Sequence, residues 1–296
     1  MASFEVVAMA LAPRQYLSKF ANYYRRLGAS RVRIYFDGSM ESDHSLSGIE
    51  LTQCDGAFWR KANVLRPATV EDRQRFIYNH AYVGANSDWV LIVDIDEFVF
   101  GKTTLHDVLY RASGRYDVVR FGSAEAVFLN HETISSDYGA RTFRRPCNRY
   151  LAAVLPHLVY PGLGHLFIRG LLGHSRGKQA VRAGIPGIFL DIHDATAEGL
   201  PLREYAASEG PSPLYLAHYD AISFGQWRQK WDRRVVARDV KEMGRKRERQ
   251  LDLYAKEARI GAKETLFRRL YCLNYLQFSI LRALGLIVVD CAIFEM

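Results

Sequence analysis

Apolar residues recur along the first part of the chain in short runs, separated by stretches with helical spacing. Two runs, at 4–11 and 89–93, predict strands buried on both faces. Pro13 suits the first turn of a helix that ends before Gly28, and Thr69 begins another helix with a capping pattern. The expected elements are strands at 4–11, 31–36, 49–54, 89–93 and 117–121, with helices at 13–27, 69–83 and 104–112. This alternation predicts an α/β fold with a mostly parallel sheet flanked by helices.

Three carboxylates follow the run at 89–93 directly, as Asp94, Asp96 and Glu97. Strand alternation places Asp94 and Asp96 on one face and Ile95 on the other. Carboxylates are costly to bury without cations, and their hard oxygens suit Mg²⁺ or Mn²⁺ carrying a phosphorylated ligand. The alternative is a solvated strand end. Parallel sheets bind ligands at the carboxyl ends of their strands, where Asp37 also falls.

Composition narrows the class of protein. The 296 residues suffice for one large α/β domain or two small ones. A formal charge of +8 favours an anionic partner, which could be a nucleotide, a phospholipid head group or nucleic acid. The four cysteines are scattered without a C-x-x-C pair, which fits a reducing compartment. The first residues lack a basic n-region, and no apolar run reaches the length of a spanning helix. We therefore expect a cytoplasmic protein.

The later part of the chain is organised differently. Residues 123–212 are less regular and rich in Gly, Pro, Arg and His, which predicts loops that face an acceptor. A long charged helical stretch is expected from 224 to 260. The simplest division is one domain at 1–222 with a helical C-terminal extension at 223–296.

Several segments carry a resemblance to a known family. They are Leu27-Gly28, Val32 to Ser39, Arg73 to Asn79, Asp88 to Phe98, and His218-Tyr219 followed by Ser223-Phe224 and Lys230. In this order they resemble the GT-A glycosyltransferases of the family 2-like group, in a DxDEF subgroup similar to family 92. The resemblance covers residues 4–232 and implies a GT-A, Rossmann-like fold. One departure is Ala12-Pro13-Arg14, where relatives usually carry a Lys-Asn-Glu-like segment.

The resemblance also implies roles for individual residues. Asp96 would hold Mn²⁺ or Mg²⁺, and Asp94 would contact the metal, its water shell or the donor ribose. Asp37 would lie beside the nucleoside of a UDP- or GDP-sugar. His218 would bring an imidazole to the metal or a donor to the diphosphate. The metal would stabilise the charge that grows on the departing phosphate.

Other candidates follow from the residues themselves. Lys178 and Arg182 would share one face of a strand and could clamp phosphate, although exposed basic residues are the commoner explanation, and Lys230 has the same two interpretations. An inverting transfer needs a carboxylate base for the acceptor hydroxyl. The candidate bases are Asp191 and Asp194, ranked first, and then Glu125 and Asp137.

The C-terminal segment and the overall function leave alternatives. A basic helix followed by an amphipathic one can lie on an anionic membrane, pack as a solvated tail, or form a homodimer contact. The favoured function is transfer of a sugar to a glycan or lipid-linked acceptor in surface polysaccharide or lipopolysaccharide synthesis. An inactive glycan-binding scaffold and a two-metal phosphotransferase or nuclease are the alternatives. No phosphate-binding loop or aromatic–basic platform is present in the sequence, so nucleic acid is not an expected partner.

Overall fold

The computed structural model describes residues 2–39, 48–132, 134, 138–236, 244–290 and 293. Contacts divide the chain into two compact units, and both are built from separate stretches of sequence. Unit 1 comprises residues 1–122, 176–216 and 293–296, and unit 2 comprises 123–175 and 217–292. The boundary expected between residues 222 and 223 therefore lies inside unit 2. The C-terminal helices group with residues 123–175 instead of forming an extension of their own.

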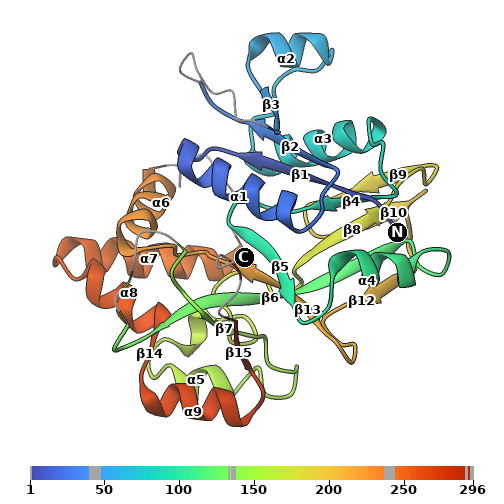
Figure 1. The fold of residues 1–296 in the computed structure, drawn as a ribbon. Helices are drawn as coiled ribbons and strands as arrows, with labels where there is room; N and C mark the ends of the chain where they lie inside the picture. The colour runs from blue at the N-terminus through green and yellow to red at the C-terminus, as the bar shows by residue number, and fades with distance from the viewer. Residues whose placement is uncertain are drawn as a thin grey trace. The chain divides into compact units, whose positions relative to one another are not determined.

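The sheet of unit 1 confirms the predicted α/β fold. Its strands are β1 (Phe4–Ala10), β2 (Arg31–Phe36), β3 (Glu50–Gln53), β4 (Trp89–Ile92), β5 (Glu97–Gly101), β8 (Lys178–Arg182), β12 (Glu204–Ala206) and the first part of β6 (Val118–Leu129). Four of them run parallel in the order β3-β2-β1-β4. β8 then runs antiparallel to both β4 and β6 (Figure 1). A short antiparallel sheet of β9 (Ile188–Leu190), β10 (Ala195–Ala197) and β11 (Leu200–Pro201) follows β8 in the chain.

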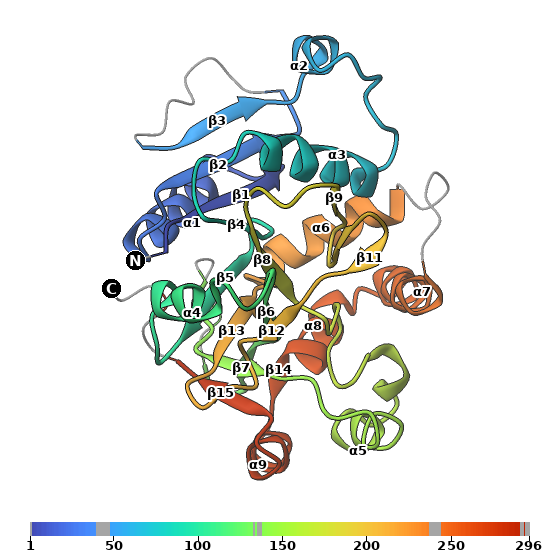
Figure 2. The ribbon, with the colours of Figure 1, turned by 90° about the vertical axis from the view of Figure 1, so that its right-hand side faces the viewer.

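Helices cover this sheet on both faces (Figure 2). They are α1 (Arg14–Arg26), α2 (Gly56–Lys61), α3 (Val70–Val83) and α4 (Leu105–Ala112). The predicted cap of α3 is confirmed, because the Thr69 side chain accepts from the backbone N–H of Asp72. Ile77 and Tyr78 of α3 are buried in one core with Val7 and Ile92 of the sheet. This packing anchors α3 over the strands whose carboxyl ends carry the candidate site.

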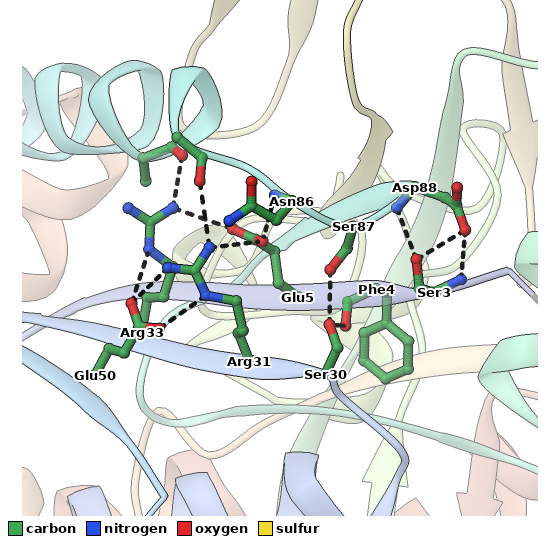
Figure 3. A network of polar contacts seen from close by, with 12 residues as sticks. Ser3, Phe4, Glu5, Ser30, Arg31, Arg33, Glu50, Asn86, Ser87 and Asp88 are labelled. Carbon is green, nitrogen blue, oxygen red and sulfur yellow. Dashed lines mark hydrogen bonds and ion pairs between the residues drawn. The ribbon is translucent and has the colours of Figure 1, made fainter.

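A buried carboxylate stands among the apolar residues of β1. Glu5 is inaccessible to solvent, and it accepts hydrogen bonds from the Arg33 guanidinium at 3.1 Å and from the backbone N–H of Asn86 at 3.1 Å. Arg31, whose guanidinium lies 3.5 Å from Glu5, also pairs with Glu50 at 2.7 Å (Figure 3). The basic residues that alternate along β2 thus neutralise the charge on the neighbouring strand, which makes its burial tolerable.

Unit 2 combines short strands with helices. Its elements are the later part of β6, β7 (Thr142–Arg144), β14 (Cys272–Leu273), β15 (Ile287–Val289), α5 (Leu155–Val159), a 3₁₀ turn at Gly164–Leu166, α6 (Phe224–Val236), α7 (Arg245–Arg259), α8 (Lys263–Tyr271) and α9 (Tyr275–Ala283). β13 (Leu214–His218) runs across the boundary between the units.

The charged C-terminal helices bury an aromatic face. Trp227 of α6, Tyr254 of α7 and Phe267 of α8 are buried, with ring centroids 5.2 Å and 5.5 Å from that of Trp227. The expected single stretch from 224 to 260 thus contains two helices, while residues 237–243 lie outside the described part. Within the described residues, no helix is long and apolar enough to span a membrane.

Candidate functional site

The predicted carboxylate cluster lies in a turn. β4 ends at Ile92 and β5 begins at Glu97, so the expected strand alternation at Asp94 and Asp96 is wrong. The turn is closed by a hydrogen bond from the Glu97 backbone N–H to the Asp94 carbonyl at 3.0 Å. The turn therefore lies at the carboxyl end of β4, which is the edge of the sheet where the sequence predicts a ligand site.

Asp94 is held by three side chains. The Lys178 ammonium lies 3.0 Å from Asp94 Oδ2, while the Gln74 amide and the Tyr78 hydroxyl donate to Oδ1 at 3.0 and 3.2 Å. The Lys178 side chain is 0% exposed, whereas that of Asp94 is 31% exposed. A buried cation therefore stands behind a carboxylate that still faces solvent.

Glu97 completes this cluster. It is buried, accepts from the backbone N–H of Asp94 at 2.7 Å, and lies 3.9 Å from the Lys178 ammonium. Burial lowers the pKa of Lys178, but the charges of Asp94 and Glu97 help to raise it by more, so the ammonium stays protonated. Burial also raises the pKa of Tyr78 well above its ordinary value, which keeps its hydroxyl a donor.

Three consecutive residues of α3 each contact a different candidate carboxylate. Arg73 Nε donates to Asp37 at 2.8 Å, Gln74 to Asp94 at 3.0 Å, and Arg75 Nε to Asp191 at 2.7 Å. This segment is part of the resemblance to GT-A glycosyltransferases, but its sequence alone predicts no role for these three side chains. Because α3 is anchored in the core by Ile77 and Tyr78, it sets the relative positions of all three carboxylates.

Asp37 is engaged from two sides. Besides Arg73, the Arg66 guanidinium donates to its Oδ1 at 2.8 Å, and the carboxylate is buried. Arg73 also donates to the carbonyls of Pro67 and Ala68, which ties it to the loop before α3. Asp37 thus lies at the end of β2, as predicted, and its charge is balanced by two arginines.

Asp191 and Asp194 form the turn between β9 and β10. The Asp191 backbone N–H donates to the Asp194 carbonyl at 2.7 Å. Burial raises the pKa of Asp191, but the hydrogen bond from Arg75 and others lower it by more, so the net pKa falls below its ordinary value. Asp194 pairs with Arg120 at 3.2 Å and Arg176 at 2.5 Å. Lys178 reaches the same turn, 3.4 Å from the Ile192 carbonyl.

Lys178 and Arg182 do not form one clamp. β8 runs antiparallel to β4, so Gln179 lies opposite Ile92 and Arg182 opposite Trp89. Lys178 consequently reaches the carboxyl edge of the sheet, whereas Arg182 lies at the amino edge and pairs with Asp117 at 2.8 Å. The four-residue spacing that puts both on one strand face also separates them along the strand.

Glu125 in unit 2 is a buried structural carboxylate. It pairs with the buried Arg144 at 2.9 Å and accepts from the backbone N–H groups of Leu172 and Gly173. Arg144 in turn donates to the Tyr160 hydroxyl at 2.7 Å. With its oxygens occupied and no solvent access, Glu125 does not suit the role of a base.

His218 is the last residue of β13, and its ring lies close to the backbone of Gly173. A Cβ at Gly173 would stand 3.1 Å from His218 Cε1 and 3.0 Å from Glu125 Oε1, so glycine allows this approach. The imidazole is partly exposed in unit 2. Asp137, the remaining candidate base, lies outside the described residues.

Lys230 pairs with Asp220, a partner that the sequence did not predict. Its ammonium lies 2.9 Å from Asp220 Oδ1, and the other oxygen of Asp220 accepts from the Tyr271 hydroxyl at 2.5 Å. Burial raises the pKa of Asp220, but nearby cations, Lys230 first among them, lower it by more to well below its usual range. Asp220 directly follows the His218-Tyr219 pair that carries the resemblance, and this position is the sequence feature that could have identified it.

The fit of a divalent metal differs between the two turn aspartates. Both Asp94 oxygens already have donors, and one donor is a buried ammonium that would repel a second cation. Asp96 offers hard carboxylate oxygens and partial exposure, which suit Mg²⁺ or Mn²⁺. Across the described part of the chain, no group of three or more His, Cys, Asp or Glu side chains is arranged to hold a metal.

Comparisons with known proteins return distant structural similarities only. No family model matches the chain, and no curated protein matches it. A crystal structure of S. aureus TarS 1–349 aligns at a TM-score of 0.38 with 16% identity, over 77% of this chain and 64% of that one. Glucosyl-3-phosphoglycerate synthase from Mycobacterium tuberculosis, crystallised with Mn²⁺, UDP-glucose and phosphoglyceric acid, aligns at 0.32 with 16% identity, over 61% and 56%. The chain thus spans less than two thirds of the length of both proteins.

Proposed function

We propose that this chain is a metal-dependent glycosyltransferase that takes its sugar from a nucleotide-sugar donor, UDP- or GDP-linked. The observation that carries the proposal is the turn after β4, where the exposed side of Asp94 and the neighbouring Asp96 stand at the carboxyl edge of a parallel sheet. The buried Lys178 ammonium pairs with Asp94 at 3.0 Å and holds it in place. A diphosphate with a divalent cation complements such an edge in charge and in ligand type.

In this proposal three aspartates of unit 1 have separate roles. Asp96 would hold Mn²⁺ or Mg²⁺, and the bound metal would stabilise the charge on the departing diphosphate. Asp94, already paired with Lys178, would accept from the donor ribose or from a water of the metal. Asp37, fixed by Arg66 and Arg73, would border the nucleoside.

The base is assigned to the turn between β9 and β10. Asp191 and Asp194 are partly exposed, whereas Glu125 is buried with its oxygens occupied. Arg75 would have to release Asp191 for it to accept a proton, since their pairing lowers its pKa. Inversion at the anomeric carbon is part of the same proposal. His218 is retained as a ligand of the metal or the diphosphate, as the resemblance implies.

The acceptor in this proposal is a glycan or lipid-linked glycan of a surface polysaccharide or lipopolysaccharide. The enzyme would act in the cytoplasm, peripherally on the inner face of the membrane. The apolar C-terminal segment would either contact this membrane or form a homodimer contact.

The test is a thermal-shift panel of UDP-, GDP-, CMP- and dTDP-sugars with and without Mn²⁺. At about 100 times the dissociation constant, a ligand adds about 2.7 kcal/mol to the free energy of unfolding. We expect one nucleotide to raise Tm with Mn²⁺, and the Mn²⁺-dependent part to vanish in Asp96→Asn. Glu209→Gln, an exposed carboxylate elsewhere in unit 1, is the matched control. A shift that is equal in Asp96→Asn would remove Asp96 from the metal site. No shift with any nucleotide would favour the scaffold alternative.

A further inference from the structure

Unit 2 exposes an apolar stripe around α5. Tyr150 is 76% exposed, and Leu151, Val154 and Leu158 are also accessible to solvent. The spacing of about four residues from Leu151 to Leu158 puts these side chains on one side of the turn and short helix that they form. Leu155 and Val159 face the interior instead. The stripe is therefore the outer face of an amphipathic segment.

A second exposed apolar segment lies beside the first. Tyr275 of α9 is 86% exposed, and Leu276 and Leu284 are exposed with it. The Gln277 amide donates to the Val159 carbonyl at 2.7 Å, and the Arg145 backbone N–H donates to the Leu286 carbonyl at 2.8 Å. Residues 145–159 and 277–286 are thus tied together at both ends, and both ribbon views show α5 next to α9 (Figures 1 and 2).

The charged residues of these two segments are all basic. No Asp or Glu occurs from 138 to 190 or from 265 to 289. The parts of these stretches in unit 2 contain Arg141, Arg144, Arg145, Arg149, Arg169, Arg268, Arg269 and Arg282. Arg144 is buried against Glu125, and Arg268 pairs with Glu264. Arg149, Arg269 and Arg282 are exposed, and Arg149 stacks on Tyr150 with its guanidinium carbon 4.9 Å from the ring centroid.

We infer that this surface, formed by Tyr150, Leu151, Val154, Leu158, Tyr275 and Leu276, docks on an anionic lipid bilayer. Exposed leucines with neighbouring tyrosines suit the boundary between acyl chains and head groups. Arginines beside them reach anionic head groups while their stems stay in the apolar zone. The surface concerns membrane attachment alone and does not depend on the proposed sugar transfer.

The most basic helix, α7, is not part of this membrane-contacting surface. α7 also carries Glu248, Asp252 and Glu257, and its apolar residues Leu251 and Tyr254 are buried in unit 2. A helix whose apolar face is already covered has nothing to insert into a bilayer. The α5–α9 surface offers apolar side chains and positive charge together.

The test is flotation of the full chain with vesicles of phosphatidylcholine alone and of phosphatidylcholine mixed with phosphatidylglycerol. We expect binding to the anionic vesicles that weakens with salt. The double variant Leu158→Ser, Leu276→Ser should weaken it at least about 10-fold. Arg149→Gln and Arg282→Gln should each weaken it about fivefold. The control is Leu65→Ser with Val83→Ser, two exposed apolar residues of unit 1 that should leave binding unchanged.

Other outcomes would overturn the inference. Equal loss in the unit 1 control, or full binding by the double variant, would remove this surface from membrane contact. Sedimentation shows whether a second copy covers the surface. If the parent chain forms a dimer that the double variant dissociates, and the parent chain does not bind vesicles, then a second copy of the chain occupies this surface in place of a lipid bilayer. Circular dichroism and urea unfolding confirm that the variants fold. The nucleotide-dependent Tm shift should survive in the double variant, which separates this inference from the proposed function.

Discussion

Two lysine–aspartate pairs in the two units show opposite exposure. In unit 1 the Lys178 side chain is fully buried and its partner Asp94 is 31% exposed. In unit 2 the carboxylate of Asp220 is only 3% exposed, while its partner Lys230 is 28% exposed. The N–O distances are nearly equal, at 3.0 and 2.9 Å. Distance alone would therefore assign the two pairs the same role.

The exposed member decides what each pair can do. A carboxylate that faces solvent with a buried cation behind it can accept hydrogen bonds from a ligand while remaining ionised. A buried carboxylate capped by a lysine and by the Tyr271 hydroxyl has little capacity for a new partner and ties α6 to α8. The comparison favours a ligand-binding role for Asp94 and a structural role for Asp220 and Lys230.

The largest expected effect on stability is at the unit 2 pair. Lys230→Met leaves the buried Asp220 carboxylate without its ammonium partner and should lower the free energy of unfolding by about 3–5 kcal/mol. Urea unfolding followed by circular dichroism measures this. Gln229→Met, at an adjacent position of α6, is the control. A loss below about 1 kcal/mol would mean that the carboxylate is solvated or protonated, against the comparison.

The corresponding change in unit 1 should affect binding more than folding. Lys178→Met removes the buried cation, but Asp94 can turn to solvent, so we expect a loss of about 1–3 kcal/mol in unfolding free energy. Nucleotide affinity in the presence of Mn²⁺ should fall at least about 10-fold, because Asp94 loses its fixed position. Calorimetric titration measures the affinity, and Lys178→Arg tests whether charge alone rescues it. Unchanged affinity in Lys178→Met would contradict the role given to this pair.

The two pairs should also respond to opposite ends of the pH scale. The pKa of Asp220 is depressed in the folded state, so its contribution is complete above the unfolded pKa of about 3.9 and is lost as pH falls through the folded value. The pKa of Lys178 is raised, so its contribution is complete below about pH 10 and is lost as pH rises through the folded value. Asp220→Asn should therefore flatten the pH dependence of stability below about pH 5, with a change of at most about 1.4 kcal/mol per pH unit. Urea titrations at several pH values check this, and an unaltered acid slope would contradict it.

The smallest effect is expected at α3. Gln74→Ala removes one donor to Asp94 but leaves Lys178 and Tyr78 in place, so stability should fall by about 0.5–1.5 kcal/mol. Nucleotide affinity should change less than in Lys178→Met, which would rank the supports of Asp94. A larger loss of affinity in Gln74→Ala than in Lys178→Met would reverse that ranking.

Much of the fold could be predicted because it follows from local patterns. The apolar runs correspond to β1 and β4, Pro13 directly precedes α1, and Thr69 caps α3. The division into units could not be predicted, because it depends on which distant stretches pack together. The charged C-terminal stretch looks solvated in sequence, yet its widely spaced aromatic residues meet in a core.

The sequence by itself determined the alternation of strands and helices, the acidic turn after β4 and the acid-free stretches of unit 2. These features rest on residue type and spacing within one segment. Only the tertiary structure decided that Lys178 is buried behind Asp94, that Arg182 lies at the opposite edge, and that Arg73, Gln74 and Arg75 contact three different carboxylates. The reason is physical: ion pairing and burial depend on strand direction and on partners far apart in the chain. The spacing of residues within one segment specifies neither the strand direction nor the distant partners.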